Sequence, residues 1–408
     1  MKKILVIGAG IGQYYLVQKA QKMGLYVIVV SPKGNYPAIT IADELYECDI
    51  YDRDSIVEFA RLNSISAVIS DQNDLMMPTV AYVAEKLGLP GNTFKQVASY
   101  CDKDRFREIC GQIGNPVPNY ICLTTEELPI FEVPFPWIVK PVDSQSSIGI
   151  TKVKGEEEVK DAIKVAFEKS KQHRVIVEQF FKGKEYVCEG FVYHGVYYNL
   201  SFGDRIYFKN IKSPIPCQTQ FPSSLPLDVQ DKIIQCEQRF TSFVNASFGI
   251  VHSEYLVNDD GNFCVVESAI RGGGVYISSH LIPLSTGIDI NTLLLKCALG
   301  ESLCMEKELG GRINQVAAYI CFTLPCGIIV EIKGLEELKN INGVKMVDIR
   351  DMQVGDLCNE MTSKGMRKGP IIVSANTNDE LLNIIEKVHQ TLKVSVKTTL
   401  GIKNIIWD

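Results

Sequence analysis

Residues 252–274, HSEYLVNDDGNFCVVESAIRGGG, contain two candidate strands on either side of Asp260-Gly261. An Asp-Gly pair is a strong signal for a two-residue hairpin turn of type I′. That turn would place Glu254 directly opposite Glu267. Directly opposed residues of antiparallel strands lie about 5 Å apart at Cβ, so the two carboxylates would repel each other. The hairpin therefore requires a nearby cation, and a divalent metal ion held by oxygen ligands is the natural candidate.

The same register pairs Asn258 with Phe263 and Leu256 with Val265. The residues around the two glutamates are therefore mostly apolar and offer no solvated surface that would weaken the repulsion. Arg271 and three glycines follow the second strand. This combination of paired acids, a cation and a small-residue turn suggests a site for a metal-bound polyphosphate.

The size and composition of the chain predict a well-packed protein of two to four structural units, because 408 residues exceed one ordinary core. A net charge of −6 argues against nonspecific nucleic-acid binding. Thirteen cysteines without a C-x-x-C pattern indicate small core residues in a reducing compartment. Glycines 8, 10 and 12 interrupt the apolar N-terminal run, so neither a signal peptide nor a membrane span is expected. We therefore expect a cytoplasmic protein.

Strands and helices alternate through the first 98 residues and predict a doubly wound, Rossmann-like α/β unit. The expected strands are 3–7, 27–30 and 67–70, and the expected helices are 12–23, 54–62 and 78–87. Gly8-x-Gly10-x-Gly12 follows the first strand, but Gln13 replaces the third glycine of the dinucleotide fingerprint. Ser31 also stands where an acidic residue should end the second strand. The glycines are therefore expected to form a tight strand-to-helix turn.

The rest of the chain mixes both element types. The expected helices are 103–113, 156–169, 227–248, 290–299 and 379–391, and the expected strands are 137–140, 150–153, 174–181, 185–199, 316–322, 328–332, 345–349 and 371–375. The proline-rich segment 203–224 is expected to be an exposed substrate loop. The resulting domains are 1–99, 100–308 with a lid subdomain at about 125–198, and an α+β domain at 309–408.

Two further groups of residues suit a nucleotide. Lys140 ends an apolar strand and precedes a loop at 143–149 rich in hydroxyl and backbone N–H groups, which favours a polyphosphate. Glu178 and Glu185 flank an apolar strand end whose backbone can read an adenine edge, while a carboxylate can hold ribose hydroxyls. Taken singly, each of these residues is more often an exposed surface residue than a ligand contact.

The order of these pieces resembles the ATP-grasp superfamily. The series is Lys103, then Lys140 with its small-residue loop, then E-x₂-F-x₃-E at 178–185, then the paired acidic strands and Arg271-Gly-Gly. The resemblance also includes Ala42-Asp43-Glu44, Ser70-Asp71 and Leu87–Gly91. The tail looks like the small C-terminal domain of the biotin carboxylase-like and amino-acid ligase branches, and the carbamoyl-phosphate synthase large chain is similar too. The resemblance implies an ATP-grasp fold with an N-terminal Rossmann-like (pre-ATP-grasp) domain and a small C-terminal α+β domain.

The resemblance also implies which residues bind ATP. The two lysines would contact the phosphates, the Ser/Gly loop would close over them, residues 178–181 would contact adenine and Glu185 would hold the ribose. The implied ATP-binding residues are Lys103, Lys140, Ser146, Ser147, Gly149, Glu178, Gln179, Phe180, Phe181 and Glu185.

Glu254 and Glu267 would coordinate Mg²⁺, with Mn²⁺ as the alternative ion, and the implied catalytic residues are Arg271 and Lys140. One departure concerns the metal site, because the family commonly has Glu-x-Asn-x-Arg where this chain has Glu267-Ser268-Ala269-Ile270-Arg271. Water or Ser268 could replace the missing Asn. Otherwise the second metal site is weak, or the protein binds nucleotide without turnover.

The resemblance implies that ATP phosphorylates a carboxylate and that an amine then attacks the acyl-phosphate, releasing ADP and phosphate. Biotin carboxylases carry Gln-Val-Glu-His after the arginine, whereas this chain has three glycines, so a small-molecule carboxylate and an amine are the expected substrates. The glycines would let a substrate carboxylate approach backbone N–H groups. The candidate substrate contacts are Arg271, Gly272, Gly273, Asp204, Arg205 and His280.

Three other functions stay open on the sequence alone. They are a bicarbonate-using carboxylase or carbamoyl-phosphate-synthase-like enzyme, a dinucleotide oxidoreductase, and a non-catalytic ATP-binding regulator. No nucleic-acid or membrane partner is expected, and a homodimer is usual in related proteins.

Overall fold

The computed structural model describes residues 1–143, 148–209, 211, 215–274, 276–349 and 352–408. The chain forms two compact units. Unit 1 consists of residues 1–200, 225–279 and 289–310, and unit 2 consists of residues 201–224, 280–288 and 311–408. In this division, segments 201–224 and 280–288 group with residues 311–408. The three-domain division expected from the sequence stays a prediction.

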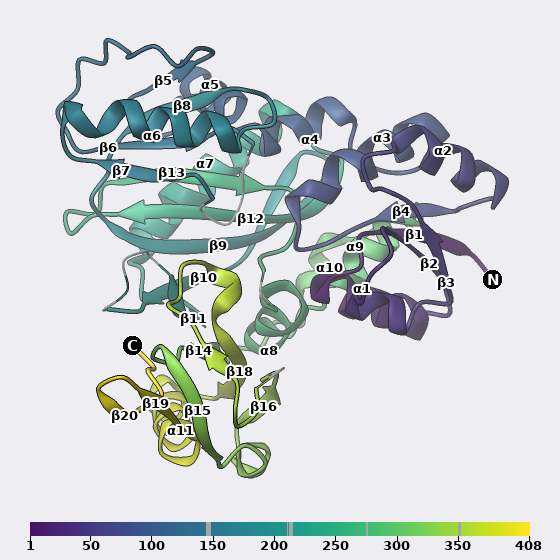
Figure 1. Cartoon of the computed structure of the whole chain (residues 1–408). Coiled ribbons are helices and arrows are strands. Elements are labelled where there is room, and N and C mark those ends of the chain that lie inside the picture. The colour runs from purple at the N-terminus through teal and green to yellow at the C-terminus, as the bar shows by residue number, and fades with distance from the viewer. Residues whose placement is uncertain (144–147, 210, 212–214, 275, 350–351) are drawn as a thin grey trace. The chain divides into compact units, whose positions relative to one another are not determined.

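Unit 1 begins with a four-stranded parallel sheet of order β3-β2-β1-β4 (Figure 1). Its strands are β1 (Lys3–Ile7), β2 (Tyr26–Ser31), β3 (Glu44–Glu47) and β4 (Ala67–Ile69), and its helices are α1 (Ile11–Lys22), η1 (Pro37–Thr40), α2 (Arg53–Leu62), η2 (Asp74–Met76) and α3 (Met77–Leu87). The apolar run of β1 is almost fully buried, as expected for a parallel strand covered on both faces. Gly88 ends α3 in the left-handed conformation. The expected Rossmann-like unit is confirmed.

The turn after β1 explains the departure from the dinucleotide fingerprint. Gly8 has a φ of +90°, and its N–H donates to the carbonyl of Val30 at 2.8 Å. The Gln13 side chain accepts a hydrogen bond from the N–H of Gly10 and donates one to the carbonyl of Asp71. Gln13 therefore ties this turn to the segment that follows β4.

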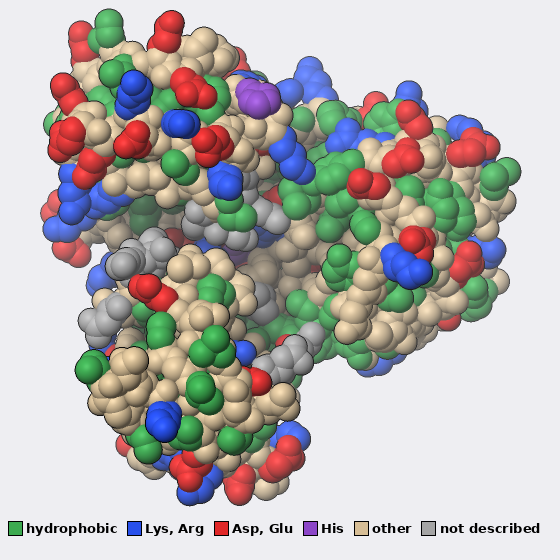
Figure 2. Space-filling model, viewed as in Figure 1, with side chains coloured by type: hydrophobic (Ala, Val, Ile, Leu, Met, Phe, Trp, Pro, Cys, Tyr) green, Lys and Arg blue, Asp and Glu red, His purple; other side chains and the backbone are tan. Residues whose placement is uncertain are grey.

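A second sheet of unit 1 is antiparallel, has the order β5-β8-β6-β7, and carries a helix on one face (Figure 1). Its elements are β5 (Tyr120–Leu123), β6 (Trp137–Pro141), β7 (Thr151–Val153), α6 (Glu156–Lys169) and β8 (Val175–Gln179). Val159, Ile163 and Ala166 lie on one helical face and pack against Trp137 and Val177. Figure 2 shows acidic and basic side chains mixed over the outer surface of this layer.

The third sheet of unit 1 contains β13, β12 and β9 and the first residues of β10. Its strands are β9 (Lys184–Tyr193), β10 (Val196–Tyr207), β12 (Phe248–Val257) and β13 (Phe263–Ala269); the helices of this part are α4 (Phe94–Cys101), α5 (Lys103–Gln112), α7 (Leu227–Val244), α9 (Ile290–Ala298) and α10 (Met305–Leu309). Helix α7 ends four residues before its predicted end, because Asn245 adopts the left-handed conformation.

The turn between β12 and β13 is one residue longer than the sequence predicts. The N–H of Asn258 donates to the carbonyl of Asn262 at 2.9 Å, and the N–H of Gly261 donates back to the carbonyl of Asn258 at 3.1 Å. The loop therefore has three residues, with Gly261 at a φ of +79°. The observed pairs are Val257 with Phe263 and Leu256 with Cys264, so the predicted pairs Asn258–Phe263 and Leu256–Val265 are wrong.

A bulge at Val266 restores the predicted register farther along the hairpin. Tyr255 pairs with Val265, but Glu254 pairs with Glu267, so Val266 is the extra residue. The pairing of the two glutamates is therefore confirmed, although two deviations that cancel produce it.

Unit 2 has two antiparallel sheets and one long helix. One sheet runs from the end of β10 through β11 (Pro216–Phe221), β14 (Val316–Phe322), β18 (Lys368–Ala375) and β16 (Val344–Val347); the other has the order β17 (Leu357–Cys358), β15 (Gly327–Lys333), β19 (Lys393–Thr398) and β20 (Gly401–Asn404). The helices are α8 (Ile282–Thr286), α11 (Asn378–Thr391) and the short η4 (Glu337–Asn340) and η5 (Lys364–Met366). The short η3 (Ile277–Leu281) begins in unit 1 and ends in unit 2. The small α+β domain is confirmed. The prediction of an exposed loop at 203–224 is wrong where the end of β10 pairs with β11 and β11 pairs with β14. Residues 210 and 212–214 lie outside the described residues.

Among the described residues, no single helix is long and apolar enough to cross a membrane, although one bent pair, 277–286 with 290–298, would pass on length and composition alone.

Candidate functional site

The two paired glutamates lie on one face of the β9–β12–β13 sheet. Side chains two residues apart in a strand share a face, and the next pair on this face is His252 with Ala269. Glu254 is 9% exposed, and Glu267 is more open. The hairpin therefore directs two carboxylates, one imidazole and one methyl group to the same side.

Lys103 supplies positive charge beside this pair. Its Nζ lies 3.9 Å from Oε2 of Glu267. Lys103 is also the first residue of α5, where the positive end of the helix dipole disfavours a lysine unless an anion is near. Lys103 thus supplies part of the positive charge that the two opposed glutamates were expected to need. The lysine and the helix terminus together also suit an anionic ligand.

Arg271 stands at the end of β13 and is held by Asp74. Its Nε and Nη2 lie 3.0 and 2.7 Å from the two carboxylate oxygens of Asp74, and its Nη1 donates to the carbonyl of Gly272 at 3.1 Å. Burial alone would lower the pKa of Arg271, but Asp74, followed by Glu267 and Glu254, raises it. The guanidinium is therefore charged and lies within electrostatic range of both paired glutamates.

Asp71 holds the loop that follows Arg271. Its side chain is fully buried and accepts hydrogen bonds at 2.7 Å from the N–H of Gly272 and from the hydroxyl of Ser278. Asp71 and Asp74 were not predicted as site residues. A sequence signal existed, because both follow β4 at the carboxyl end of a parallel sheet, where ligands commonly bind.

Glu189 and His252 were also missed. Glu189 on β9 pairs in register with His252 on β12, and its Oε1 contacts the imidazole Nδ1. The other ring nitrogen, Nε2, lies 3.5 Å from Oε1 of Glu254. The spacing of His252 and Glu254 indicated a shared face, but nothing local in the sequence indicated Glu189.

The glycines after Arg271 are packed against these carboxylates. A Cβ at Gly272 would lie 2.7 Å from Oδ1 of Asp71, and a Cβ at Gly273 would lie 2.7 Å from Nδ1 of His252. Their N–H groups donate to Asp71 and Glu189. In this structure the two donors that the sequence assigned to a substrate carboxylate thus have protein partners, and the assignment of Gly272 and Gly273 to a substrate stays a prediction.

Glu178 lies at the centre of a buried ion-pair network. Its carboxylate lies 2.6 Å from Nζ of Lys140 and 2.6 Å from Nε of Arg107. Burial alone would raise the pKa of Glu178, but Arg107 and Lys140 outweigh it and hold the pKa at about 2. Arg107, which is 1% exposed and was not predicted, also donates to the carbonyl of the bulge residue Val266 at 2.7 Å. Arg107 therefore connects strand β8 to strand β13.

The remaining predicted nucleotide residues lie on and beside this layer. The N–H of Phe180 donates to the carbonyl of Pro136 at 3.0 Å, and Nζ of Lys152 lies 3.4 Å from the Phe180 ring centroid. Glu185 on β9 pairs with Leu256. The other residues of this group are Gln179, Phe181 and Gly149, which has a φ of +74°; Ser146 and Ser147 lie outside the described residues. The nucleotide roles of all these residues stay predictions.

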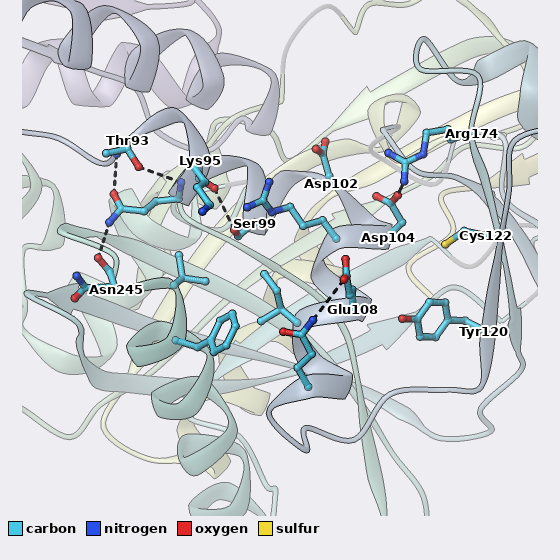
Figure 3. Close-up of a pocket in the computed structure, with 16 residues that line it drawn as sticks. Thr93, Lys95, Ser99, Asp102, Asp104, Glu108, Tyr120, Cys122, Arg174 and Asn245 are labelled. Carbon is cyan, nitrogen blue, oxygen red and sulfur yellow. Dashed lines mark hydrogen bonds and ion pairs between the residues drawn. The ribbon is translucent and has the colours of Figure 1, made fainter.

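A cavity of about 260 Å³ opens beside Glu267. Asp74, Lys103, Glu267, Ser268 and Ala269 contribute to its lining. A larger hollow of about 1020 Å³ lies elsewhere in unit 1, along α4, α5 and β5 (Figure 3). None of the predicted site residues lines the larger hollow, so the smaller cavity is the one that the candidate site adjoins.

The paired glutamates fit one hard divalent cation. They offer carboxylate oxygens from adjacent strands, and Mg²⁺ commonly takes one or two carboxylates and fills its other positions with phosphate oxygens and water. Ser268 is an unsuitable replacement for the missing Asn, because it is hydrogen-bonded to the Ser253 hydroxyl at 2.8 Å and adjacent strand residues face opposite sides. Among the described residues, no cluster of three or more His, Cys, Asp or Glu side chains is arranged to hold a metal.

The other predicted substrate contacts belong to unit 2. Asp204 contacts the Ser223 hydroxyl and accepts a hydrogen bond from the N–H of Ser224 at 3.0 Å, so it stabilises a turn. Arg205 pairs with Thr219 on β11. Burial lowers the pKa of His280 to about 4, which keeps its ring neutral at pH 7. The substrate roles of these three residues stay predictions.

Three family models match successive parts of the chain. Residues 1–89 match the ribonucleotide synthetase preATP-grasp domain, residues 109–280 match the D-ala D-ala ligase C-terminus, and residues 320–397 match the L-amino acid ligase C-terminal domain 2.

Curated relatives show the same similarity at lower coverage. The formate-dependent phosphoribosylglycinamide formyltransferase of Synechococcus sp. is 26% identical over 186 residues, which are 44% of this chain and 48% of the relative. The D-alanine–D-alanine ligase of Francisella philomiragia is 27% identical over 272 residues, 65% of this chain and 85% of the relative. The chain thus spans about half the length of the first of these relatives.

The structural similarity extends over nearly the whole chain. The crystal structure of an L-amino acid ligase from Bacillus licheniformis matches 98% of this chain and 99% of its own, with a TM-score of 0.83 and 23% sequence identity. This likeness and the three consecutive family models confirm the expected fold. The chain belongs to the ATP-grasp superfamily.

Proposed function

We propose that this protein is an ATP- and Mg²⁺-dependent carboxylate–amine ligase that forms an amide or peptide bond and releases ADP and phosphate. The observation that carries the proposal is a group of four charged residues. Lys103 and Glu267 line one cavity, Glu254 pairs with Glu267 across the hairpin, and Arg271 lies within electrostatic range of both glutamates. The similarity to proteins named D-alanine–D-alanine ligase and L-amino acid ligase supports a carboxylate and an amine as substrates.

Positive charge at this site serves phosphoryl transfer, in which catalysis is mostly positioning and charge stabilisation. Glu254 and Glu267 would hold Mg²⁺, which neutralises phosphate charge when bound. Lys103, in the first turn of α5, would contact the phosphates of ATP. Arg271 would stabilise the charge that develops on the phosphoryl group, because Asp74 and the Gly272 carbonyl fix its orientation.

The nucleotide would lie against the β5-β8-β6-β7 layer, with adenine at residues 178–181 and the ribose at Glu185. The buried network of Glu178, Lys140 and Arg107 gives this end of the site a fixed set of charges. Lys140 is already fixed by its ion pair with Glu178. A nucleotide contact from this lysine would therefore cost little additional loss of side-chain entropy.

The partners proposed are small molecules, and Mn²⁺ is the alternative metal. The thirteen free thiols, seven of them buried, fit a reducing compartment, so a cytoplasmic location is part of the proposal. A homodimer is likewise an expectation carried over from related proteins.

A phosphate-release screen tests the proposal. The protein is incubated with ATP, Mg²⁺ and pooled carboxylates and amines, with bicarbonate in a separate arm and Glu267→Gln as the inactive control. Release that needs one carboxylate together with one amine supports the ligase. Phosphate release stimulated by bicarbonate alone contradicts the proposal. The absence of phosphate release with a broad pool of carboxylates and amines, while ATP still binds, also contradicts it.

A further inference from the structure

A buried row of polar residues lies directly behind the paired glutamates. Glu189, His252 and Ala269 occupy consecutive positions across β9, β12 and β13. The adjacent row on the same face is Val187, Glu254 and Glu267. Glu189 is 0% exposed and His252 is 2% exposed, so neither reaches solvent or a ligand directly from the surface.

His252 is held between two carboxylates. Its Nδ1 contacts Glu189, and its Nε2 faces Oε1 of Glu254 at 3.5 Å. A histidine whose one nitrogen is bound to a buried carboxylate has a fixed ring orientation, and its second nitrogen then orients whatever it faces. Here the group that it faces is the carboxylate proposed to bind the metal.

Glu189 also contacts the loop that carries Arg271. Its Oε2 accepts a hydrogen bond from the N–H of Gly273 at 3.4 Å. Gly273 packs so closely on this pair that an added Cβ would lie 2.7 Å from Nδ1 of His252. Glu189 therefore contacts both His252, which faces Glu254, and the backbone of Gly273, which lies two residues after Arg271.

Ala269 contributes no polar group to this row. It lies opposite His252 on the hairpin and carries only a methyl group. Within the row, His252 is therefore the residue that places a polar atom near Glu254.

We propose that Glu189 and His252 are positioning residues that orient Glu254 for metal binding and seat the Arg271 loop. This inference rests on the proposed function, because it takes Glu254 to be a metal ligand. Residues that orient metal ligands typically change metal affinity by about 10–100-fold when they are replaced.

The test measures Mn²⁺ binding in the presence of ADP by electron paramagnetic resonance, without turnover. Glu189→Gln keeps the shape of the side chain and should weaken Mn²⁺ binding by about 10-fold or more. ADP affinity in the absence of metal should change less than about 2-fold, because the residues proposed to bind the nucleotide, Glu178 on β8 and Lys140 on β6, make no contact with Glu189 that this variant would remove. His252→Asn should weaken Mn²⁺ binding by a similar factor. This variant provides the test if Glu189→Gln does not fold.

Glu237→Gln is the matched control. Glu237 on α7 is equally buried and hydrogen-bonds the Tyr255 hydroxyl at 2.6 Å, but Tyr255 faces the other side of β12 from Glu254. This control should retain wild-type Mn²⁺ affinity even where its melting temperature falls. Unchanged Mn²⁺ affinity in both Glu189→Gln and His252→Asn overturns the positioning role, as does an equal loss in Glu237→Gln. Failure of the wild type to bind Mn²⁺ with ADP would instead overturn the metal assignment in the proposed function.

Discussion

Asp74 and Arg271 form a two-point ion pair, with Nε–Oδ1 and Nη2–Oδ2 distances of 3.0 and 2.7 Å. The two residues are 197 positions apart in the chain. Their pairing joins the start of η2 to the segment just after β13, so the Rossmann-like layer supplies a partner for the arginine proposed to act on the phosphoryl group. Both side chains are largely buried, which makes loss of one partner costly.

Replacing Asp74 by Asn should destabilise the protein by about 2–4 kcal/mol, because the Arg271 charge loses its partner. Urea unfolding at pH 7 measures this change. Asp228→Asn, which breaks the exposed Lys232–Asp228 pair, is the control and should have little effect. Equal stabilities for the two variants would contradict the importance of the buried pair.

The pH dependence of the wild type should reflect the same ion pair. Burial alone would raise the pKa of Asp74, but Arg271 outweighs it and lowers the pKa. A lowered folded pKa means that the contribution of Asp74 is present above its unfolded value and is lost as the pH falls through the folded value. The free energy of unfolding should therefore fall less steeply below pH 4 in Asp74→Asn than in the wild type.

Glu178→Gln should reduce the pH dependence of the free energy of unfolding in the same direction as Asp74→Asn, and by a larger amount. The pKa of Glu178 is about 2 instead of the ordinary 4.5, so folding gains roughly 3 kcal/mol above pH 4.5 that is lost as the pH falls toward 2. The variant lacks this dependence and also leaves Arg107 and Lys140 without their shared carboxylate. Stability curves between pH 7 and pH 2 measure it, and parallel curves for the two proteins would argue against an ionised Glu178.

Arg107→Lys should weaken nucleotide binding and lower stability by about 2–3 kcal/mol. A lysine has one compact ammonium and cannot bond both Glu178 and the Val266 carbonyl as the guanidinium does. Calorimetric titration with ADP and thermal unfolding measure the two effects. Arg61→Lys, at an exposed ion pair, is the matched control.

Gly273→Ala should cost about 1–3 kcal/mol, because the added methyl group overlaps Glu189 and His252. Gly274→Ala is a neighbouring control, since the nearest atom to its Cβ would be the Gln72 carbonyl oxygen at 3.7 Å. Thermal unfolding of both variants is the measurement. A tolerant Gly273 together with a sensitive Gly274 would contradict the packing described for this loop.

Local patterns in the sequence were sufficient for much of the fold. Strand and helix order followed from apolar periodicity and from turn residues such as Gly88, which ends α3. The opposition of Glu254 and Glu267 was predictable because both lie within one hairpin. The bulge at Val266 was not predictable from the hairpin alone, because its carbonyl accepts a hydrogen bond from Arg107, which lies 159 positions away in the chain.

The tertiary structure alone decided which residues complete the candidate site. Asp71, Asp74, Arg107 and Glu189 reach their partners from segments distant in the chain, and no local periodicity specifies such pairs. It also packs Gly272 against Asp71 and Gly273 against Glu189, which the sequence did not predict. The sequence thus determined the opposed glutamates, because neighbouring strand residues share one short turn. Their surroundings depend on how the layers of unit 1 pack, because burial and ion pairing act between residues that only the folded chain brings together.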